Sequence, residues 1–495
     1  MRPVHHIVIV GGGTAGWLAA AGLGKIYEGR LKVTLIESDQ IPTVGVGEAT
    51  IPTMQAFHKL LEIPEHEVMQ ATNATYKVGI NFTNWGQIGE NYTHGFGQVG
   101  RIFWGGEFQH FWTRGRQMGL DLNYEDFCLE CVAARNERFA VTENPPLNYA
   151  HHLDAALYAR YLRRFSEKHG VIRREGLVQN VKQDSDTGYI TELLLEDGGV
   201  IEGDLFIDCS GFRALLTEQT LKTGYENWQH WLPADSALAV QTEKVESAPP
   251  FTRSIAHPYG WQWQIPLRNR TGNGIVFSSR FTDREGAEKT PRANLYAPLR
   301  GEPRLIRFTT GRRKLAWNKN CIAMGLASGF LEPLESTSIH MVTSAVIRLL
   351  RLMPFQGIQP AVVNEYNRQA REEAESTRDF IILHYHATRR NDTEFWDYMR
   401  TMSVPDTLRH RIDLFRESGM IFLSDSELFR HNGWSQVLIG QGFYPKTYQG
   451  AVGNMDDQKM REYLQGFKEH VANAVARLPK HEEFLERAYG KVELA

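Results

Sequence analysis

The chain has 495 residues, enough to bury a large core, and this length predicts roughly two to four domains or one large interleaved enzyme. Hydrophobic residues make up 42% and charged residues 23%, as in ordinary globular proteins. The net charge of -3 gives no electrostatic indication of binding to nucleic acid or to an anionic membrane. The sequence holds no apolar run of about 18 residues, and its first apolar strand follows Met1 closely. We therefore expect neither a membrane span nor a signal peptide, and a cytoplasmic location.

The first predicted elements are a strand, a glycine turn and a helix. The apolar run Ile7–Val10 leads into Gly11-x-Gly13-x-x-Gly16, and an alanine-rich helical pattern follows. In such a turn the first glycine makes the bend, the second lets phosphates approach the backbone, and the third lets the helix pack close to the strand. A second strand ends about 20 residues later in Glu37, where an acid can bind ribose hydroxyls. The pattern predicts a dinucleotide, FAD or NAD, because a glycine turn without a ligand leaves Glu37 unexplained.

The next segment, residues 38–53, holds prolines and glycines and few charges, and we expect it to lie along the ligand. Residues 54–63 are predicted to be helical, and residues 78–85 alternate as a strand does. Just before that strand, Lys77 stands among aromatic and β-branched residues. From this pattern alone Lys77 is either a solvated strand end or a catalytic residue.

A second match to the glycine pattern, Gly95-x-Gly97-x-x-Gly100, follows polar residues and precedes no helix start, so we do not expect it to bind a nucleotide. The same region is dense in aromatic and histidine side chains. They are His94, Phe96, Phe103, Trp104, Phe108, His110, Phe111 and Trp112. They line a flat aromatic pocket or pack a core, and the sequence leaves both readings open.

Residues 149–169 are predicted to be helical and to end at Gly170. Two strands joined by Asp197-Gly198-Gly199 come next, then a buried strand, Leu205–Ile207. The residues after it, Asp208 to Gly211, resemble the later nucleotide-contacting strand end of FAD-dependent enzymes, so the chain returns to its first sheet. Residues 236–310 are predicted to form an antiparallel sheet over the cofactor.

A second decisive stretch begins with a short buried strand, Cys321–Met324. A helical pattern follows it up to Pro354, with Ser336 and Thr337 at its start. Their hydroxyl groups suit capping of that helix, and backbone N–H groups there could instead hold an anion. Residues 356–495 are predicted to be largely helical. No second strand-flanked fingerprint for NAD(P)H is present, so electrons for a flavin would come from another protein.

The four cysteines, Cys128, Cys131, Cys209 and Cys321, are too few for a disulfide framework. Cys128-x-x-Cys131 has no second pair that would complete a zinc site. We therefore expect core or surface thiols and no bound metal.

Several stretches occur in the order known from one enzyme family. They are GGGTAGW, PTVGVGEATIP, NATYKVGINFTNW, DLFIDCSGF, GWQWQIP, FLEPLESTSI and RDFI followed by NDTEFW. On these stretches the chain resembles the flavin-dependent tryptophan halogenase family over nearly its whole length. GWQWQIP matches a Trp-x-Trp-x-Ile-Pro pattern that separates such halogenases from ordinary flavin hydroxylases.

The resemblance implies an α/β fold: a Rossmann-like FAD-binding fold of the flavin monooxygenase type, interleaved with an antiparallel sheet and a largely helical C-terminal substrate module. We expect one interleaved unit, residues 1–495. The FAD-binding module would comprise residues 1–90, 150–215 and 310–355, and the substrate module residues 91–149, 216–309 and 356–495.

The resemblance also implies a reaction in which FADH2 and O2 oxidise a bound halide, chloride or bromide, to hypohalous acid, which diffuses through the protein to an electron-rich arene. A separate NAD(P)H-dependent flavin reductase would supply FADH2. The expected partners are this reductase and a small aromatic substrate, with no nucleic acid and no membrane. The oligomeric state is left open, with a homodimer as one option.

The family pattern assigns site residues by their matching positions. The catalytic pair is Lys77 and Glu335. Thr337 and Ser338 match the halide site, His94, Phe96 and Phe429 the substrate site, and Trp261, Trp263 and Ser336 the tunnel and its barrier. The cofactor-binding positions are Gly11, Gly13, Thr14, Ala15, Gly16, Glu37, Gly47, Ala49, Val178, Leu326 and Ile339.

The assigned chemistry places an amine and a carboxylate beside the arene. A lysine with an ordinary pKa of about 10.4 is neutral in only roughly 1 in 2,500 molecules at pH 7. Lys77 therefore either donates a hydrogen bond to hypohalous acid as an ammonium, or burial lowers its pKa enough for a haloamine to form. Glu335 would stabilise the cationic ring intermediate and accept its proton.

The chain departs from the tryptophan-acting members before its Val-Leu-x-Gly segment. Those members carry tandem tyrosines, an acid and a Phe-Trp pair that close over the amino acid backbone, and here the segment is shorter, with Leu428-Phe429 at the Phe-Trp position. We expect an indole or similar arene, including a larger one or one carried within a peptide, and not free tryptophan. Ser338 stands where the family usually has glycine. A flavin-dependent aromatic hydroxylase and a non-catalytic flavin-binding protein remain alternatives.

Overall fold

The computed structural model describes residues 3–41, 47–103, 106–292, 294–295 and 297–491. The chain divides into two compact units, each assembled from three segments. Unit 1 comprises Met1–Ala74, Leu153–His230 and Arg307–Ala374, and unit 2 comprises Thr75–His152, Trp231–Ile306 and Glu375–Ala495. Each unit therefore depends on contacts between residues that are far apart in the sequence.

A six-stranded sheet forms the centre of unit 1. Its strands, in spatial order, are β20 (Trp317–Asn318), β21 (Cys321–Ala323), β12 (Leu205–Asp208), β1 (His6–Val10), β2 (Lys32–Glu37) and β8 (Ile172–Glu175). All neighbours pair in parallel except β20 with β21. The strands β1 and β12 are almost wholly buried, as expected of parallel strands covered on both faces. The predicted return of the chain to its first sheet is confirmed, because β12 pairs with β1.

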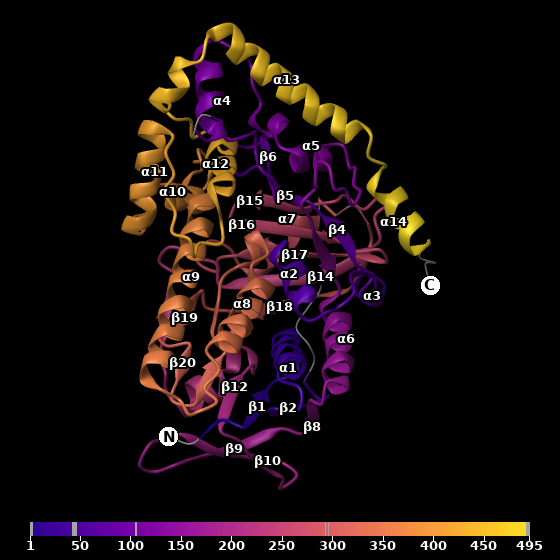
Figure 1. Ribbon diagram of the computed structural model, residues 1–495, viewed down its shortest axis with the longest axis vertical. Coiled ribbons are helices and arrows are strands. Elements are labelled where there is room, and N and C mark those ends of the chain that lie inside the picture. Colours follow the sequence, from indigo (N-terminus) through magenta and orange to yellow (C-terminus); the bar gives the residue numbers. More distant parts are fainter. Residues whose placement is uncertain (1–2, 42–46, 104–105, 293, 296, 492–495) are drawn as a thin grey trace. The chain divides into compact units, whose positions relative to one another are not determined.

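Helices pack on this sheet, and Figure 1 shows α1 beside β1 and β2. The helices of unit 1 up to residue 351 are α1 (Thr14–Ile26), α2 (Thr53–Leu60), α3 (Glu65–Ala71), α6 (Ala155–Lys168) and α8 (Ser338–Arg351). Both α6 and α8 pack against α1. A Cβ atom on Gly22 of α1 would lie 2.5 Å from Val346 Cγ1 of α8, so glycine permits this close helix contact.

The helix predicted for residues 149–169 is wrong in its first part. Ala150–Leu153 forms strand β7, and α6 begins only after Asp154. The Asp154 carboxylate accepts hydrogen bonds from Ala156 N and Leu157 N and so caps the helix. The strand was missed because its sequence, Ala-His-His-Leu, has no β-branched residue and no alternation.

Smaller sheets complete unit 1. One has the order β11 (Val200–Glu202), β10 (Ile190–Leu195), β9 (Val178–Gln183), with the predicted hairpin between β10 and β11. The other has the order β13 (Tyr225–Asn227), β19 (Gly311–Arg313), β22 (Gly329–Phe330). Short helical turns lie at Gly211–Arg213, Leu215–Thr220, Gly325–Ala327 and Pro333–Glu335, and β3 spans Glu48–Ala49.

A seven-stranded sheet forms the centre of unit 2. Its order is β18 (Leu299–Arg307), β14 (Ser236–Glu243), β17 (Arg270–Phe277), β16 (Gly260–Pro266), β15 (Thr252–His257), β5 (Gly79–Thr83) and β6 (Asn91–Gly95). Strands β14 to β17 pair antiparallel, which confirms the sheet predicted within residues 236–310, and β15 pairs in parallel with β5. The polar residues before Gly97 form β6, whose antiparallel pairing with β5 differs from that of a nucleotide-binding strand.

Helices dominate the C-terminal part of the chain, as predicted. They are α9 (Pro360–His386), α10 (Glu394–Thr401), α11 (Asp406–Ser418), α12 (His431–Gly440), α13 (Asp457–Ala476) and α14 (His481–Tyr489), with a short turn at Gly450–Asn454. The remaining helices of unit 2 are α4 (Phe108–Gln117), a turn at Tyr124–Phe127, α5 (Leu129–Arg135) and α7 (Arg284–Arg292), and β4 spans Thr75–Lys77. Within unit 2, α13 packs against α4 and α5, and Figure 1 shows it as the long yellow helix that leads to α14.

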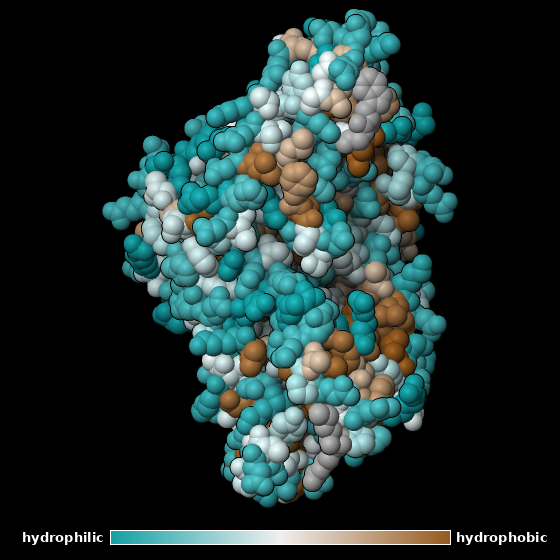
Figure 2. Space-filling model, turned by 60° about the vertical axis from the view of Figure 1, so that its left-hand side comes forward, coloured by the Kyte–Doolittle hydropathy of each residue, from teal (hydrophilic) through white to brown (hydrophobic). Residues whose placement is uncertain are grey.

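The helices and the surface differ from those of a membrane-spanning protein in the following respects. Across the described ranges, no helix combines the length and the apolar character needed to cross a bilayer. Figure 2 shows a face that is covered mostly by hydrophilic side chains, with apolar side chains in separate groups.

Candidate active site

The glycine turn in unit 1 has the geometry of a phosphate-binding loop. Gly11 has φ +113°, and a Cβ atom on it would lie 2.2 Å from Cys209 O. A Cβ atom on Gly16 would lie 1.9 Å from Gly11 O. The fold itself therefore requires glycine at both positions. Gly13, the N-cap of α1, has no atom within 4 Å of its Cβ position, so its face is open where phosphates would approach the start of the helix, beside Thr14.

Glu37 ends β2 and turns toward this loop. A Cβ atom on Gly12 would lie 1.5 Å from Glu37 Oε2, so the carboxylate lies directly against the loop. Arg173 Nε of β8 donates to Glu37 Oε1 at 2.6 Å, and Trp17 Nε1 is 3.4 Å from Oε2. The sequence pattern gave no role to Gly12 or Arg173. Only the spacing of Gly12 beside two other glycines could have drawn attention to it.

Two further predicted flavin neighbours pack close to the loop. Leu326 lies in the turn Gly325–Ala327, and a Cβ atom on Gly325 would lie 2.7 Å from Ala15 Cβ. This turn also packs against α8, which carries the buried Ile339. The structure therefore brings Ala15, the turn of Leu326 and α8 together. These residues fit a dinucleotide, since they leave an open helix start, an acid beside it and an apolar wall.

The remaining predicted cofactor residues, Gly47, Ala49 and Val178, also lie in unit 1. Val178 begins β9 and packs against an apolar cluster of unit 1 that includes Val10 and Ile36. Gly47 and the buried Ala49 flank the partly buried Glu48. Residues 42–46 of the loop expected along the ligand lie outside the described residues.

The start of α8 is buried and electrostatically suited to an anion. Glu335, Ser336 and Thr337 are 1%, 4% and 1% exposed. Ser336 has φ +59°, a backbone conformation that costs about 1–3 kcal/mol in a residue other than glycine. The predicted capping is wrong: Thr337 is the N-cap, but its side chain makes no capping hydrogen bond. The anion site stays a prediction, which rests on the N–H groups and the positive dipole end that the first turn of a helix offers.

Lys77 is the last residue of β4 in unit 2 and is wholly buried, so its reading as a solvated strand end is wrong. Its Nζ lies 5.2 Å from the centre of the Phe96 ring. An ammonium over an aromatic face is stabilised by the ring, and more so when water is excluded. The nearby His152 has a lowered pKa, chiefly because it is buried and also because of the charge on Lys77.

Of the predicted substrate residues, Phe96 lies beside Lys77, and His94 and Phe429 lie beside each other. His94 lies on β6 two residues before Phe96, and its ring centre is 6.1 Å from that of Phe429. Phe429 in turn stacks on Phe380 with ring centres 3.8 Å apart. Within unit 2 the structure therefore pairs Lys77 with Phe96, and groups His94 with Phe380 and Phe429. Phe380 was not among the predicted residues, and no local pattern marks it.

The aromatic region around and after β6 packs a core in part. Phe108, Phe111 and Trp112 are buried on α4, and Phe108 also contacts the ring of Phe467 on α13. Phe96 lies beside Lys77, and His94 lies beside Phe429. For His94 and Phe96 the aromatic pocket stays a prediction. Trp104 lies outside the described residues.

Trp261 and Trp263 lie on one face of β16, with ring centres 6.1 Å apart. A Cβ atom on Gly274 of β17 would lie 2.1 Å from Trp263 Cζ2, so the indole of Trp263 lies flat across this glycine. Trp261 is 1% exposed and its ring also approaches that of Trp85. The two indoles form one rigid aromatic layer on the sheet.

The four cysteines are buried free thiols. Within the described part of the chain, no group of three or more His, Cys, Asp or Glu side chains is arranged to hold a metal ion.

An α/β unit with a glycine turn at the end of its first parallel strand and an acid at the end of the second defines the class of dinucleotide-binding proteins. A sequence profile described as tryptophan halogenase matches residues 6–457. Tryptophan 7-halogenase RebH of Lentzea aerocolonigenes is 34% identical, over 99% of each chain. The chain belongs to the tryptophan halogenase family and is a flavin-dependent halogenase.

Solved structures agree with this family. Xcc4156, a flavin-dependent halogenase from Xanthomonas campestris, is 52% identical and superimposes with a TM-score of 0.97, over 98% of this chain and 99% of that one. BrvH, a flavin-dependent halogenase from Brevundimonas sp. BAL3, is 41% identical with a TM-score of 0.94, over 98% and 99%. The Rossmann-like α/β fold expected from the sequence is confirmed.

The family sets the cofactors and the reaction class. The enzyme uses FADH2, a halide ion and O2 to halogenate aromatic substrates, and the hydroxylase and non-catalytic alternatives are not favoured. Enzymes of this family are generally two-component systems, in which a separate flavin reductase supplies the reduced flavin.

Proposed function

We propose that this enzyme halogenates an electron-rich, indole-like arene bound beside Lys77, using hypohalous acid formed elsewhere in the protein. The observation that carries the proposal is the wholly buried Lys77, with its Nζ 5.2 Å from the Phe96 ring centre and with His94 two residues before Phe96 in the chain. A buried cation next to aromatic rings can hold a polar oxidant and a flat substrate in one place.

In this proposal FAD, when bound, supplies with O2 the oxidising equivalents that convert halide to hypohalous acid. The glycine turn with Thr14 and Ala15 holds the pyrophosphate, Glu37 the ribose, and Gly47, Ala49, Val178, Leu326 and Ile339 line the cofactor. We assign the cofactor to residues 1–90, 150–215 and 310–355 and the substrate to the remaining segments. The open face of Gly13 supports the pyrophosphate position.

The start of α8 is proposed to hold the halide through the backbone N–H groups of Thr337 and Ser338. The burial of Thr337 and the missing side-chain cap support this, because an anion can then interact with the positive end of the helix. Trp261, Trp263 and Ser336 are proposed to line the path between the flavin and the substrate. The tryptophan pair keeps the substrate away from the flavin, which favours halogenation over direct hydroxylation.

At the substrate, Lys77 is proposed to hold hypohalous acid by a hydrogen bond or to carry the halogen as a haloamine. Glu335 stabilises the cationic ring intermediate and accepts the proton that leaves when aromaticity returns, a role typically worth about 10²–10⁴ in rate. Near-complete burial of Glu335 supports this, since a carboxylate that is shielded from water interacts more strongly with a nearby positive charge.

The preferred substrate is proposed to be indole or a related arene, and not free tryptophan. The short segment before α12 has two acids, Asp425 and Glu427, and Glu427 is held by two hydrogen bonds from Arg411, at 2.9 and 3.0 Å. Glu427 is therefore engaged within the protein and poorly placed to bind a substrate ammonium. His94, Phe96 and Phe429 offer aromatic surface, which any flat arene can use.

The test supplies FAD, a flavin reductase, NADH, O2 and bromide or chloride to the enzyme with a panel of indoles, and detects products by mass spectrometry. Lys77→Ala and Glu335→Gln are expected to lose halogenated product at least 100-fold, while flavin oxidation continues. Product that persists in both variants would refute the assigned roles. Faster turnover of tryptophan than of indole under identical conditions would refute the substrate assignment.

We further propose a cytoplasmic enzyme that interacts with a flavin reductase and with a small aromatic substrate, but with neither nucleic acid nor membrane. The net charge of -3 supports this, since it offers no strong positive field. A homodimer is one option for the oligomeric state, which size-exclusion chromatography with light scattering measures directly.

A further inference from the structure

The strand that carries Lys77 is short. It pairs antiparallel with β7, and the residues next to Lys77 in the chain add further contacts that restrain its backbone. Side chains alternate along a strand, so Lys77 and Thr75 share one face of β4 and Tyr76 projects from the other. On the side of Lys77 toward β5, Val78 N donates to Pro250 O at 2.8 Å. Whatever holds Tyr76 therefore also holds the backbone from which Lys77 extends.

Tyr76 is held by the last helix of the chain. Its hydroxyl is 2.8 Å from the Tyr489 hydroxyl, and its backbone N–H donates to His481 Nε2 at 3.3 Å. These two partners are the first and last residues of α14, separated from Tyr76 by more than 400 residues. The Tyr76 ring also stacks on Phe139 with centres 4.2 Å apart and touches Phe484 of α14 edge-on.

His481 is a fixed, neutral hydrogen-bond acceptor. Its Nδ1 lies 2.7 Å from Ala248 O, and a carbonyl can only accept, so Nδ1 carries the hydrogen. Nε2 is then left as the acceptor for the N–H of Tyr76. Burial lowers the pKa of His481 to about 4, which keeps the ring in this form near neutral pH.

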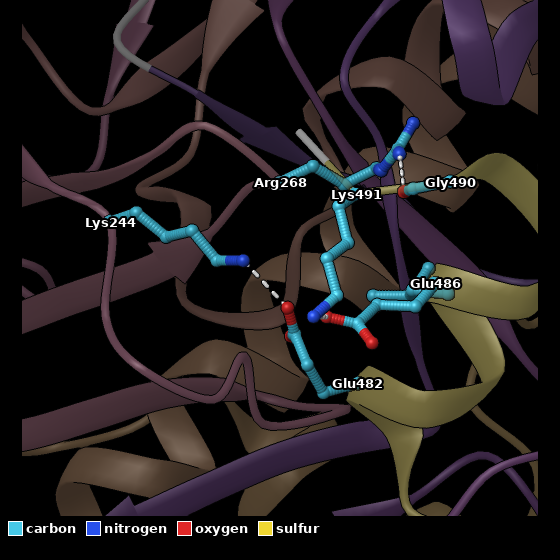
Figure 3. A pocket seen from close by; sticks show the side chains of 7 residues that line it. Lys244, Arg268, Glu482, Glu486, Gly490 and Lys491 are labelled. Atoms are coloured by element: carbon cyan, nitrogen blue, oxygen red, sulfur yellow. Dashed lines mark hydrogen bonds and ion pairs between the residues drawn. The ribbon is translucent and has the colours of Figure 1, made fainter. Parts of the chain in front are cut away.

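Both ends of α14 are tied to the body of unit 2, as Figure 3 shows beside the small pocket there. At its start, Lys244 Nζ donates to Glu482 Oε1 at 2.6 Å. At its end, the buried Arg268 donates to Tyr489 O and Gly490 O at 3.0 and 2.7 Å. Because α14 is anchored at both ends by residues outside β4, its contacts to Tyr76 can hold β4 in place.

We propose that α14 positions Lys77 for halogen transfer, with His481 and Tyr489 holding Tyr76 from the opposite face of β4. The proposal rests on the role of Lys77 given above. His481 and Tyr489 are positioning residues that act through the backbone of β4. A displacement of about 1 Å at a reacting group can cost about 10²-fold in rate, so a remote helix can control transfer.

The test changes single hydroxyl groups. Tyr489→Phe and Tyr76→Phe each remove one oxygen atom from the same hydrogen bond. The matched control is Tyr463→Phe, because Tyr463 on α13 also donates one hydroxyl hydrogen bond, to Arg101 O at 3.3 Å, and does not contact β4. For each full-length variant, halogenated indole is measured together with hypohalous acid that escapes, which is trapped by a cyclic β-diketone in solution.

We expect Tyr489→Phe and Tyr76→Phe to lower halogenated indole about 10-fold while trapped hypohalous acid rises and flavin oxidation is unchanged. The double variant should lose no more than either single variant, because both remove one shared interaction. Tyr463→Phe should match the wild type in both products. A shift of oxidant from indole to the trap reports misplacement of Lys77, which loss of stability alone would not produce.

Other outcomes contradict the proposal. If indole halogenation and trapped oxidant fall in parallel with the melting temperature, α14 has a structural role only. If both hydroxyl variants keep wild-type product while Lys77→Ala loses it, the role of Lys77 stands and positioning by α14 is wrong. If Lys77→Ala still forms halogenated indole, the proposed role of Lys77 is wrong, and the proposed function is wrong with it.

Discussion

At the scale of single residues, much of the site depends on where a side chain is missing. Gly12 makes room for the Glu37 carboxylate, and Gly274 makes room for the indole of Trp263, whose Cζ2 would lie 2.1 Å from a Cβ atom there. Gly466 differs from both, because it lies in the interior of α13 and no atom lies within 4 Å of its Cβ position. Replacement of glycine by alanine should therefore lower the stability at Gly274 and raise it at Gly466.

Gly274→Ala is expected to destabilise the protein by about 1–3 kcal/mol, because the new methyl group displaces the Trp263 ring or the backbone near Leu238 O, 2.6 Å away. Gly466→Ala is expected to stabilise it by up to about 1 kcal/mol through helix propensity. Urea unfolding measures both values, and tryptophan fluorescence should change only for Gly274→Ala. Equal effects of the two substitutions would show that Trp263 is not tightly packed on Gly274.

At the scale of elements, the end of β12 is organised by one buried carboxylate. Asp208 accepts hydrogen bonds from Ser210 N and Oγ at 3.0 and 2.6 Å, and from Leu216 N, Thr217 N and Thr217 Oγ1 at 2.8 to 2.9 Å. It therefore fixes the turn that follows the strand. The Asp-Cys-Ser-Gly sequence is explained by this network as well as by any contact with a nucleotide.

Asp208→Asn is expected to lower the free energy of unfolding by about 3 kcal/mol or more, since an amide nitrogen would face backbone N–H donors and leave at least one unsatisfied. The control is Asp197→Asn in the exposed turn before β11, which removes an ion pair with Arg174 and should cost far less. Thermal or urea unfolding of both variants gives the comparison. A loss for Asp208→Asn as small as for Asp197→Asn would contradict this account.

At the scale of the whole molecule, buried groups of opposite type set the pH dependence of stability. Burial raises the pKa of Glu48 and Glu125 to about 7. Their contribution is fully present below the ordinary pKa of 4.5 and is lost as pH rises through 7. Burial lowers the pKa of His110 and His481 to about 4, so their contribution is present above 6.5 and is lost as pH falls toward 4. The glutamates and the histidines therefore change the free energy of unfolding in opposite directions over nearly the same pH range, between about 4 and 7.

Glu48→Gln is expected to remove the contribution of one glutamate to the pH dependence of stability. A shift of the pKa from 4.5 to about 7 corresponds to about 3 kcal/mol. Relative to the wild type, the free energy of unfolding of the variant should therefore rise by about that amount between pH 4.5 and 7, and the difference should stay constant above pH 7. Urea unfolding of the FAD-free protein across this range provides the measurement. Glu202→Gln on β11, an exposed glutamate, is the matched control and should give a constant difference. Parallel curves for both variants would mean that Glu48 is ionised in the folded protein.

The sequence by itself determined the parts of this protein that local patterns encode. The glycine turn after β1, Glu37 at the end of β2, the hairpin between β10 and β11, and the helix after Thr337 all follow from the periodicity of short segments and from turn residues. The order of the motifs along the chain was also sufficient to identify the family, because proteins that share this fold keep the motifs in the same order.

Only the tertiary structure decided how distant residues meet. The cap that starts α6 after a strand, the Arg173 contact with Glu37, and the packing of Lys77 over Phe96 depend on which elements pair. The clearest case is Tyr76, whose partners lie on α14 at sequence separations of 405 and 413 residues. Local propensity carries no information across such distances, because these contacts arise from the burial of surfaces that become neighbours only when the chain folds.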